Sequence, residues 1–206
     1  MSNTYLKING IFKRDQRGKF LFGEFSDVET EKLKDFTWIG TEKIDGTNTR
    51  IIWNGENIEV RGKKDNSQIT PYIKEATEKY LNKELFKEVF GDTHVILFGE
   101  SYGCKIQSVG KQYLPDSRDF ILFDVMIDGI WLTRENVDDI AKKLNMRSVP
   151  VLFKGTIKEA IEKVTKGFKS TLSDVTAEGL VLVPDGNLRK RNGDRIITKI
   201  KFKDFR

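Results

Sequence analysis

Short turn pairs between apolar, β-branched runs constrain the fold of this chain most. One run pair is TRIIW (49–53) and NIEVR (57–61), with Asn54 and Gly55 between them. A second is FILFDVMI (120–127) and IWLT (130–133), with Asp128 and Gly129 between them. Asn-Gly and Asp-Gly supply the positive φ angles of a tight hairpin turn. The sequence therefore predicts two antiparallel β-hairpins.

Helix signals fall between the strand signals. Apolar residues recur at helical spacing from Ile69 to about Phe90, which predicts one or two helices. Thr133 can cap a helix that runs to about Asn145. Thr156 and Glu159 form a capping-box pattern, and Gly167 can end the helix that it opens.

Two further strands are predicted at 179–183 and 195–202. Most strands are joined as hairpins with helices between them, which predicts an α+β fold of antiparallel sheets flanked by helices. The chain shows no internal repeat and no low-complexity linker. We therefore expect a single domain over 1–206.

The bulk properties exclude several classes of protein. The 206 residues are 38% hydrophobic and 33% charged, as in a soluble globular protein. No apolar run approaches the roughly 20 residues of a membrane span, and the start MSNTYLKING lacks the apolar core of a signal peptide. With Cys104 and His94 as the single residues of their kinds, an intramolecular disulfide and a cysteine zinc site are excluded. We expect a cytoplasmic enzyme without membrane contact, and the net charge of +5 permits a polyanionic partner.

The hexamer KIDGTN at 43–48 contains the candidate nucleophile, Lys43. A lysine attacks only as a neutral amine, and burial or neighbouring cations favour that form. The candidate cations are Lys199, Lys201 and Arg61. Asp-Gly is also an ordinary turn, so the hexamer alone is a moderate signal.

Lys199 and Lys201 lie two positions apart on a predicted strand. Their side chains should share one face, while Ile200 and Phe202 point to the other. Two converging lysines suit a polyphosphate whose charge they neutralise as a leaving group departs. A solvated edge strand with alternating lysines explains the pattern equally well.

Three carboxylates adjoin strongly apolar strands, where they are costly unless they find a cation, a hydroxyl or a metal. Glu100 follows VILFG, Glu178 opens EGLVLVP, and Asp124 lies inside FILFDVMI. Glu178 either meets water at a sheet end or serves a metal or a ribose. For Asp124 a structural salt bridge is the commonest explanation. Phe123, beside it, is either a core residue or a ring that stacks on a nucleobase.

Six segments, in this order, resemble the nucleotidyltransferase motifs of the covalent ligase superfamily, which includes DNA ligases and mRNA capping enzymes. They are EKIDGTN, RGKK, VILFGES, FILFD, EGLVL and KIKFK, and they span about 38–205. KIDGTN is most similar to the RNA ligases that seal nicks in duplex RNA, of the small stand-alone phage or bacterial type. Many relatives in the RNA branch have histidine where this chain has Asp45, which resembles the DNA-ligase pattern.

The resemblance implies a nucleotidyltransferase (ATP-grasp-like) fold without an appended C-terminal domain. It implies an ATP-dependent RNA ligase that joins 3′-OH and 5′-phosphate ends through a covalent lysyl-AMP intermediate and an adenylated 5′ end. The expected partner is nicked or duplex RNA, in RNA repair, and a monomer is favoured. Because carboxylates are plentiful and histidine is scarce, Mg²⁺ or Mn²⁺ is the expected metal.

The resemblance also assigns roles to individual residues. Lys43 would attack the α-phosphate of ATP and carry the AMP. The implied catalytic residues are Lys43, Asp45, Asn48, Lys199 and Lys201. The implied ATP-binding residues are Glu42 beside adenine, Arg61 (or else Lys63) on the ribose or a phosphate, Glu100 on the ribose hydroxyls, Phe123 stacked on adenine, Asp124 supporting the pocket, Glu178, and Lys199 with Lys201 on the phosphates. The implied metal ligands are Glu178 and Glu100.

Other functions remain open at this level. The chain could be a small ATP-dependent DNA ligase, a GTP-using capping guanylyltransferase, or a catalytically inactive nucleic-acid-binding relative. Basic residues are available to contact a nucleic-acid backbone, and they fix position rather than sequence. These are Lys63, Lys64, Lys105, Lys111 and the cluster Arg189–Arg191, for which a solvated loop is an equal explanation.

Overall fold

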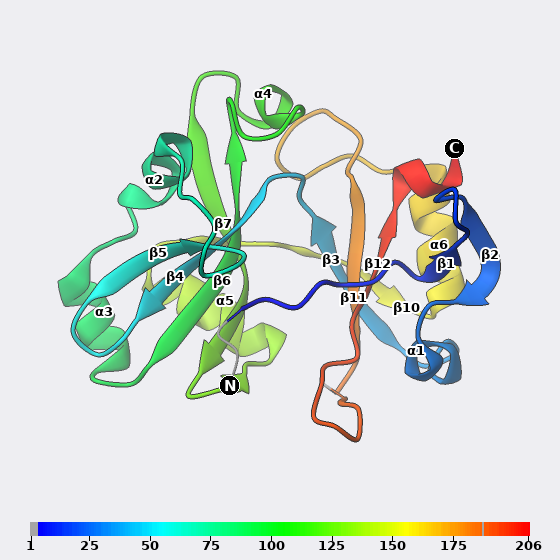
Figure 1. The fold of residues 1–206 in the computed structure, drawn as a ribbon, viewed down its shortest axis with the longest axis horizontal. Coiled ribbons are helices and arrows are strands. Elements are labelled where there is room, and N and C mark those ends of the chain that lie inside the picture. Colours follow the sequence, from blue (N-terminus) through cyan, green and yellow to red (C-terminus); the bar gives the residue numbers. More distant parts are fainter. Residues whose placement is uncertain (1–3, 187) are drawn as a thin grey trace. The chain divides into compact units, whose positions relative to one another are not determined.

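The computed structural model describes residues 4–186 and 188–206 (Figure 1). The chain forms two compact units. Unit 1 contains residues up to Leu6 together with Asp45–Val149, and unit 2 contains Lys7–Ile44 with Pro150–Arg206. The chain therefore passes from unit 2 to unit 1 between Ile44 and Asp45, inside the KIDGTN hexamer. The single domain over 1–206 stays a prediction.

Unit 1 is built on a six-stranded sheet. The strands, in sheet order, are β5 (Ile58–Gly62), β4 (Thr47–Trp53), β6 (Val95–Gly103), β7 (Arg118–Ile127) and β8 (Ile130–Trp131), with β9 (Arg147–Ser148) also paired to β7. The pairing of β9 with β7 is parallel and the others are antiparallel. This sheet confirms the predicted antiparallel α+β class.

One face of this sheet is covered by helices. They are α2 (Pro71–Glu78), α3 (Lys83–Phe90) and α5 (Arg134–Lys143), and α4 (Gly110–Tyr113) is a short further helix. Ile51 and Leu97 of the sheet are fully buried in one core with Phe86 of α3 and Val137 of α5. The core explains why the apolar stripes of the helices were readable from the sequence.

Unit 2 contains a four-stranded antiparallel sheet and a separate hairpin. The sheet order is β10 (Val151–Gly155), β3 (Trp38–Lys43), β11 (Gly179–Pro184) and β12 (Thr198–Lys201), and the hairpin is β1 (Phe12–Arg14) with β2 (Phe20–Phe25). The helices are α1 (Val28–Lys32), α6 (Ile157–Lys166) and the 3₁₀ helix η1 (Phe202–Phe205). Trp38, Leu180 and Ile200 of the sheet pack in one core with Val164 of α6.

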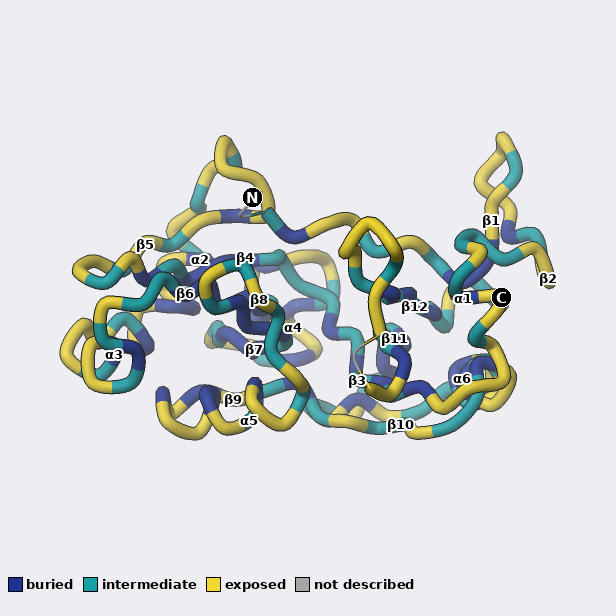
Figure 2. The backbone as a smooth tube through the Cα atoms, turned by 90° about the horizontal axis from the view of Figure 1, so that it is seen from below, coloured by how far each residue is buried: buried dark blue, intermediate teal, exposed yellow. Residues whose placement is uncertain are grey.

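Figure 2 shows how burial varies along the backbone. The turn between β1 and β2 is almost entirely exposed, whereas the buried residues of β3, β11 and β12 alternate with partly exposed ones. This alternation is the pattern of a sheet with one face on a core. It decides which side chains of unit 2 are accessible to a ligand.

Most predicted elements are confirmed. The region 69–90 forms two helices, α2 and α3, separated at Asn82, whose side chain caps α3. The capping box of Thr156 and Glu159 opens α6, and Gly167 is its C-cap. The second hairpin is also confirmed, because Asp128 and Gly129 have φ angles of 47° and 81° between β7 and β8.

Two details differ from the prediction. Asn54 and Gly55 do not form a two-residue turn: the connection runs from Asn54 to Asn57, because the Asn54 side chain accepts hydrogen bonds from the amides of Glu56 and Asn57. The strand predicted at 195–202 covers only Thr198–Lys201 (β12), and Phe202 does not continue it. It begins η1, where its amide donates to the carbonyl of Glu178 at 2.9 Å.

In the described part of the chain, no helix has the length and apolar character that crossing a membrane requires.

Candidate active site

Strand register in unit 2 aligns Lys43 with Lys201. Gly179 on the central strand β11 is the cross-strand partner of Lys43 on β3 and of Lys201 on β12. Directly paired residues point to the same face of a sheet. The two lysines, far apart in sequence, therefore flank one glycine on the same face.

The carboxylate of Glu178 joins the two lysines. Its Oε2 lies 2.7 Å from Lys43 Nζ, and its Oε1 lies 2.5 Å from Lys201 Nζ. The three side chains are only 19%, 13% and 21% exposed, in the order Lys43, Glu178, Lys201. Lys43 Nζ also donates to the carbonyl of Ile44 at 3.3 Å. The candidate nucleophile is thus held in a half-buried cluster of two lysines and one carboxylate rather than in bulk solvent.

Gly179 makes this closeness possible. Its φ of +153° suits glycine, and a Cβ placed there would lie 1.9 Å from the carbonyl oxygen of Ile200. No other residue leaves room for the β12 backbone at this position. The close approach of β12 therefore explains why glycine stands at position 179, and the sequence alone does not show this approach.

Lys199 lies on the same face of β12 as Lys201, as predicted. Ile200 between them is fully buried, while both lysines are partly exposed. Lys199 pairs with Val181 on β11, one pleat away from the Lys201–Gly179 pair. Its backbone also bonds to the segment preceding β1, accepting from the amide of Ile11 at 3.0 Å and donating to Asn9 at 3.1 Å.

Glu42 points to the buried face, away from Lys43. Its side chain is only 2% exposed and accepts hydrogen bonds from Ser170 Oγ at 2.5 Å, Thr171 N at 2.9 Å and Thr171 Oγ1 at 2.5 Å. Sequence reasoning missed Ser170 and Thr171. They lie in a polar loop that has no motif of its own, more than a hundred residues away along the chain.

In unit 1, Asn48 and Glu100 are direct cross-strand partners on β4 and β6. The turn before Asn48 lies close to β6, since a Cβ on Gly46 would be 2.3 Å from the carbonyl oxygen of Ser101. Asp45 donates its amide to the Tyr113 hydroxyl at 3.4 Å. The GTN part of the hexamer therefore places an amide beside a carboxylate on one sheet face.

Phe123 is the extra residue of a β-bulge in β7. The pairing goes from Phe98–Asp124 directly to Gly99–Leu122, so Phe123 has no partner residue on β6. Bulges re-aim side chains and are frequent beside functional sites. The Phe123 ring packs edge-on against Tyr5 with 5.1 Å between centroids.

Tyr5 is a third residue that sequence reasoning missed. Its hydroxyl donates a hydrogen bond to Asp124 Oδ2 at 2.5 Å, and the salt bridge expected for Asp124 stays a prediction. Its ring also packs on Phe98 at 5.2 Å and Trp131 at 5.6 Å. No pattern near the start of the chain announces this role.

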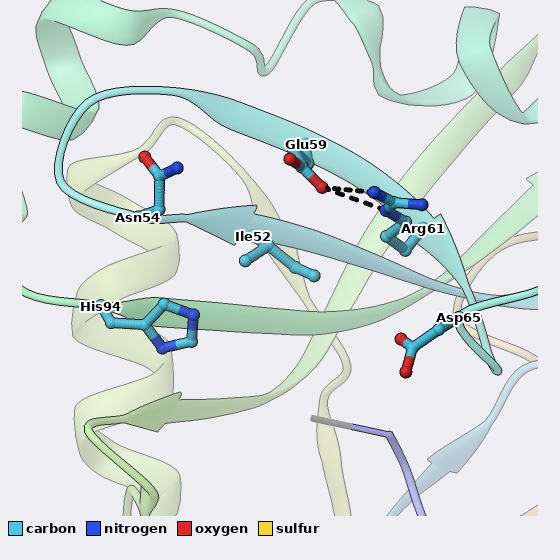
Figure 3. A pocket seen from close by; sticks show the side chains of 6 residues that line it. All are labelled: Ile52, Asn54, Glu59, Arg61, Asp65 and His94. Carbon is cyan, nitrogen blue, oxygen red and sulfur yellow. Dashed lines mark hydrogen bonds and ion pairs between the residues drawn. The ribbon is translucent and has the colours of Figure 1, made fainter. Parts of the chain in front are cut away.

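Arg61 lines a cavity of about 350 Å³ on unit 1 (Figure 3). Its guanidinium donates twice to Glu59 Oε2, at 3.0 and 2.8 Å. Its cross-strand partner Arg50 is fully buried and donates to the carbonyl of Gly62 at 2.8 Å and to Asp65 at 2.7 Å. The remaining residues that line the cavity are Ile52, Asn54, Asp65 and His94.

The residues of the basic cluster 189–191 differ in their contacts. Lys190 forms ion pairs with Asp27 and, at 3.6 Å, with Glu29. The hydrogen bond to Asp27 raises the pKa of Lys190. Arg189 and Arg191 flank it, and Arg191 is exposed, as are Lys63, Lys64, Lys105 and Lys111.

The two predicted metal ligands, Glu178 and Glu100, belong to unit 2 and unit 1 respectively. Over residues 4–186 and 188–206, no group of three or more His, Cys, Asp or Glu side chains is assembled to hold a metal ion. Mg²⁺ commonly binds through one or two carboxylates together with substrate phosphates and water. The described residues therefore do not form an all-protein cage, and the carboxylates of Glu178 and Glu100 would need further ligands to hold an ion.

Comparison with known families decides the relationship. A family model described as RNA ligase matches residues 36–201, which include every residue to which the sequence assigned a site role. The chain belongs to the RNA ligase family. No curated protein matched the sequence.

Solved structures similar to this RNA ligase family member come from Naegleria gruberi. A variant RNA ligase without ligand has a TM-score of 0.66 at 22% identity, covering 86% of this chain and 52% of its own. Another variant, solved with ATP and Mn, has a TM-score of 0.66 at 21% identity, covering 95% and 61%. The RNA ligase with PPi has a TM-score of 0.66 at 21% identity, covering 96% and 61%. These similarities show the fold, and the chain spans about half to three-fifths of the length of these proteins.

Proposed function

We propose that this protein is an ATP-dependent RNA ligase that forms a covalent lysyl-AMP on Lys43. One observation carries the proposal: in a chain of the RNA ligase family, Lys43 and Lys201 meet at the same carboxylate, 2.7 and 2.5 Å away. Two ammonium groups on one sheet face form a site for a polyphosphate. The single carboxylate of Glu178 compensates one of the two positive charges when no phosphate is bound.

The first step transfers AMP to the lysine. The Lys43 ammonium gives up one proton to solvent, and its neutral nitrogen then forms a bond to the α-phosphorus of ATP. The nitrogen releases a second proton to solvent as the phosphoramide forms. The bond from that phosphorus to the β-bridging oxygen breaks, and pyrophosphate leaves. Lys201 and Lys199, on the same face, stabilise the negative charge that develops on the phosphates. A metal ion, when bound, would supply further charge stabilisation on the phosphate oxygens.

Residues of unit 1 are proposed to bind the nucleoside and the acceptor. Glu100 would accept from the ribose hydroxyls, and Asn48, its cross-strand neighbour, would serve AMP transfer to the 5′-phosphate and the joining step. Phe123 would stack on adenine from its bulge, which Asp124 supports. Arg61, exposed in the cavity of Figure 3, would contact a ribose or a strand phosphate.

RNA with a nick in a duplex is the proposed substrate. Family membership supports RNA, and the likeness of KIDGTN to nick-sealing ligases supports the nicked form. The exposed lysines and Arg191 suit contact with the backbone, and their contribution should weaken with salt. Use of ATP and a divalent metal is supported by the Naegleria gruberi RNA ligase variant solved with ATP and Mn.

Intact-protein mass spectrometry tests the first step. After incubation with ATP and Mg²⁺ or Mn²⁺, the wild-type chain should gain the mass of one AMP, and Lys43→Ala should gain none. Lys154→Ala is the matched control, because Lys154 pairs with Asp185 at the surface, away from the cluster. An unmodified wild type, or an adduct that survives in Lys43→Ala, would overturn the proposal.

Sealing assays test the strand. The substrates are nicked duplexes with RNA or DNA on either side of the nick. Those with RNA at the nick should be joined, and the all-DNA duplex should not. A pre-adenylated 5′ end bypasses the first step, so it separates a defect in adenylation from a defect in joining. Preference for an all-DNA nick would identify a DNA ligase activity instead.

A further inference from the structure

Glu42 is a buried carboxylate whose three hydrogen bonds come from one loop. Oε1 accepts from the Ser170 hydroxyl at 2.5 Å, and Oε2 accepts from the amide and hydroxyl of Thr171 at 2.9 and 2.5 Å. A buried carboxylate is costly unless donors compensate it. No cation lies in salt-bridge range of Glu42 among the residues with described positions, so these neutral donors carry the compensation.

The loop that supplies the donors connects α6 to β11. Residues 168–177 fold back on themselves, because Ser170 N donates to Val175 O at 2.8 Å and Ala177 N donates to Phe168 O at 2.9 Å. The next residue is Glu178, which pairs with both lysines of the cluster. The loop therefore leads directly into the carboxylate that contacts Lys43.

Glu42 ties this loop to the strand that ends in Lys43. Glu42 and Lys43 are consecutive on β3, and their side chains point to opposite faces. Glu42 pairs with Leu180 and Lys43 with Gly179, so the strand contacts the loop-bearing segment at both positions. The distance from Lys43 to Glu178 is thus set by backbone pairing on one side and by the Glu42 hydrogen bonds on the other.

We infer that Glu42 is a positioning residue: it latches the 168–177 loop and so sets Glu178 against Lys43. This role rests on the proposed function, and it differs from contact with adenine. All three hydrogen bonds that the Glu42 side chain accepts come from Ser170 and Thr171. Removing the latch should slow lysine adenylation and leave the choice of nucleobase unchanged.

A double-mutant cycle tests the latch. Glu42→Gln replaces one acceptor oxygen by an amide that cannot accept, and a paired change, Ser170→Ala with Thr171→Val, removes both hydroxyl donors. Each change should lower the single-turnover rate of self-adenylation about tenfold at saturating ATP. The combination should be no slower than either alone, because partners in one network are not additive. Multiplied losses would overturn the proposal.

Nucleotide choice separates positioning from base contact. The ratio of adenylation by ATP to guanylylation by GTP should be the same in Glu42→Gln as in the wild type. A changed ratio would mean that the side chain recognises the base and would refute the latch. Thr171→Ser keeps both donors of that residue and should retain the wild-type adenylation rate. Glu159→Gln, in the exposed capping box, is the matched control and should have no effect.

Amide hydrogen exchange keeps the inference independent of catalysis. In Glu42→Gln the amides of residues 168–177, including Thr171, should exchange at least tenfold faster, while those of α6 should not change. This measurement needs no AMP adduct. If the wild type forms no adduct but the loop loosens, the proposed function fails and the latch stands; unchanged loop exchange refutes the latch itself.

Discussion

The hydroxyl of Tyr5 donates a 2.5 Å hydrogen bond to Oδ2 of Asp124, a residue 119 positions further along the chain. The bond fixes the beginning of the described chain on the face of the unit 1 sheet that carries Phe123. The Tyr5 ring completes an aromatic cluster with Phe98, Phe123 and Trp131. Tyr5 is 8% exposed, so the segment is packed into the unit rather than laid on its surface.

Tyr5→Phe should destabilise the protein by about 1–3 kcal/mol, because it leaves a buried carboxylate oxygen without this donor. Urea unfolding followed by tryptophan fluorescence measures the change, since Trp131 contacts the Tyr5 ring. Tyr72→Phe is the control: among the described residues, the Tyr72 hydroxyl has no hydrogen-bond partner, and the ring keeps its contacts with Arg118 and Lys105. Equal losses in the two variants would contradict the assignment.

The Arg50–Asp65 pair should respond unequally to mutation of its two members. Arg50 is fully buried and donates through both Nε and Nη2, so Arg50→Lys, which lacks the planar fork, should cost about 2–4 kcal/mol. The Asp65 side chain is 73% exposed, and Asp65→Asn should cost less than about 1 kcal/mol. Chemical denaturation of the two variants gives the comparison, and a larger loss in Asp65→Asn would disprove it.

Gly179→Ala should separate β11 from β12. The added Cβ would lie 1.9 Å from the carbonyl oxygen of Ile200, and backbone cannot yield as a side chain does. We expect a loss of about 1–3 kcal/mol and slower self-adenylation, because Lys201 would move away from Glu178. At Gly10 the nearest atom to an added Cβ is 3.8 Å away, so Gly10→Ala is the matched control. Indistinguishable unfolding of the two variants would count against the argument.

Stability should depend on pH through Asp27 and Lys190. Burial alone would raise the pKa of Asp27, but hydrogen bonds from Lys190 and Thr30 outweigh burial and lower it below 3.8. The stabilisation is therefore present above about pH 4 and is lost as the pH falls through the folded-state pKa. The hydrogen bond to Asp27 raises the pKa of Lys190 above 10.5, so the same contribution is lost again as the pH rises through that higher value.

Asp27→Asn isolates this effect, because asparagine can still cap α1 while losing the charge. At pH 7 the variant should be less stable by up to about 1 kcal/mol, and the difference should shrink toward pH 2 and above pH 11. Urea unfolding across this pH range provides the measurement. A difference that stays constant with pH would show that the ion pair contributes nothing.

Local chemistry explains what the sequence could predict. The Thr156–Glu159 capping box, the Asp128–Gly129 turn and the alternation of Lys199, Ile200 and Lys201 each depend on neighbours within a few residues. Such signals are readable one segment at a time. The prediction of a turn at Asn54 was wrong only in the length of the turn. The Asn54 side chain accepts hydrogen bonds from the amides of Glu56 and Asn57 and so stabilises a longer loop.

The remaining contacts depend on tertiary structure. Glu42 accepts a hydrogen bond from Ser170, 128 positions along the chain, and neither residue type predicts the other as its partner. The bulge at Phe123 arises from a register shift between β6 and β7, which no property of FILFD reveals. The sequence could indicate that Lys43 needs a charged neighbour, but the sharing of Glu178 with Lys201 required the sheet order β3–β11–β12.

Hydrogen bonds on both sides of β12 fix the register of its lysines. A slip of one residue against β11 would turn Ile200 toward water and push the two ammonium groups into the core. Because Asn9 and Ile11 bond to Lys199 from the opposite side, such a slip would break both sets of hydrogen bonds at once. The segment before β1 therefore stabilises the alignment of the two lysines on which the proposed adenylation depends.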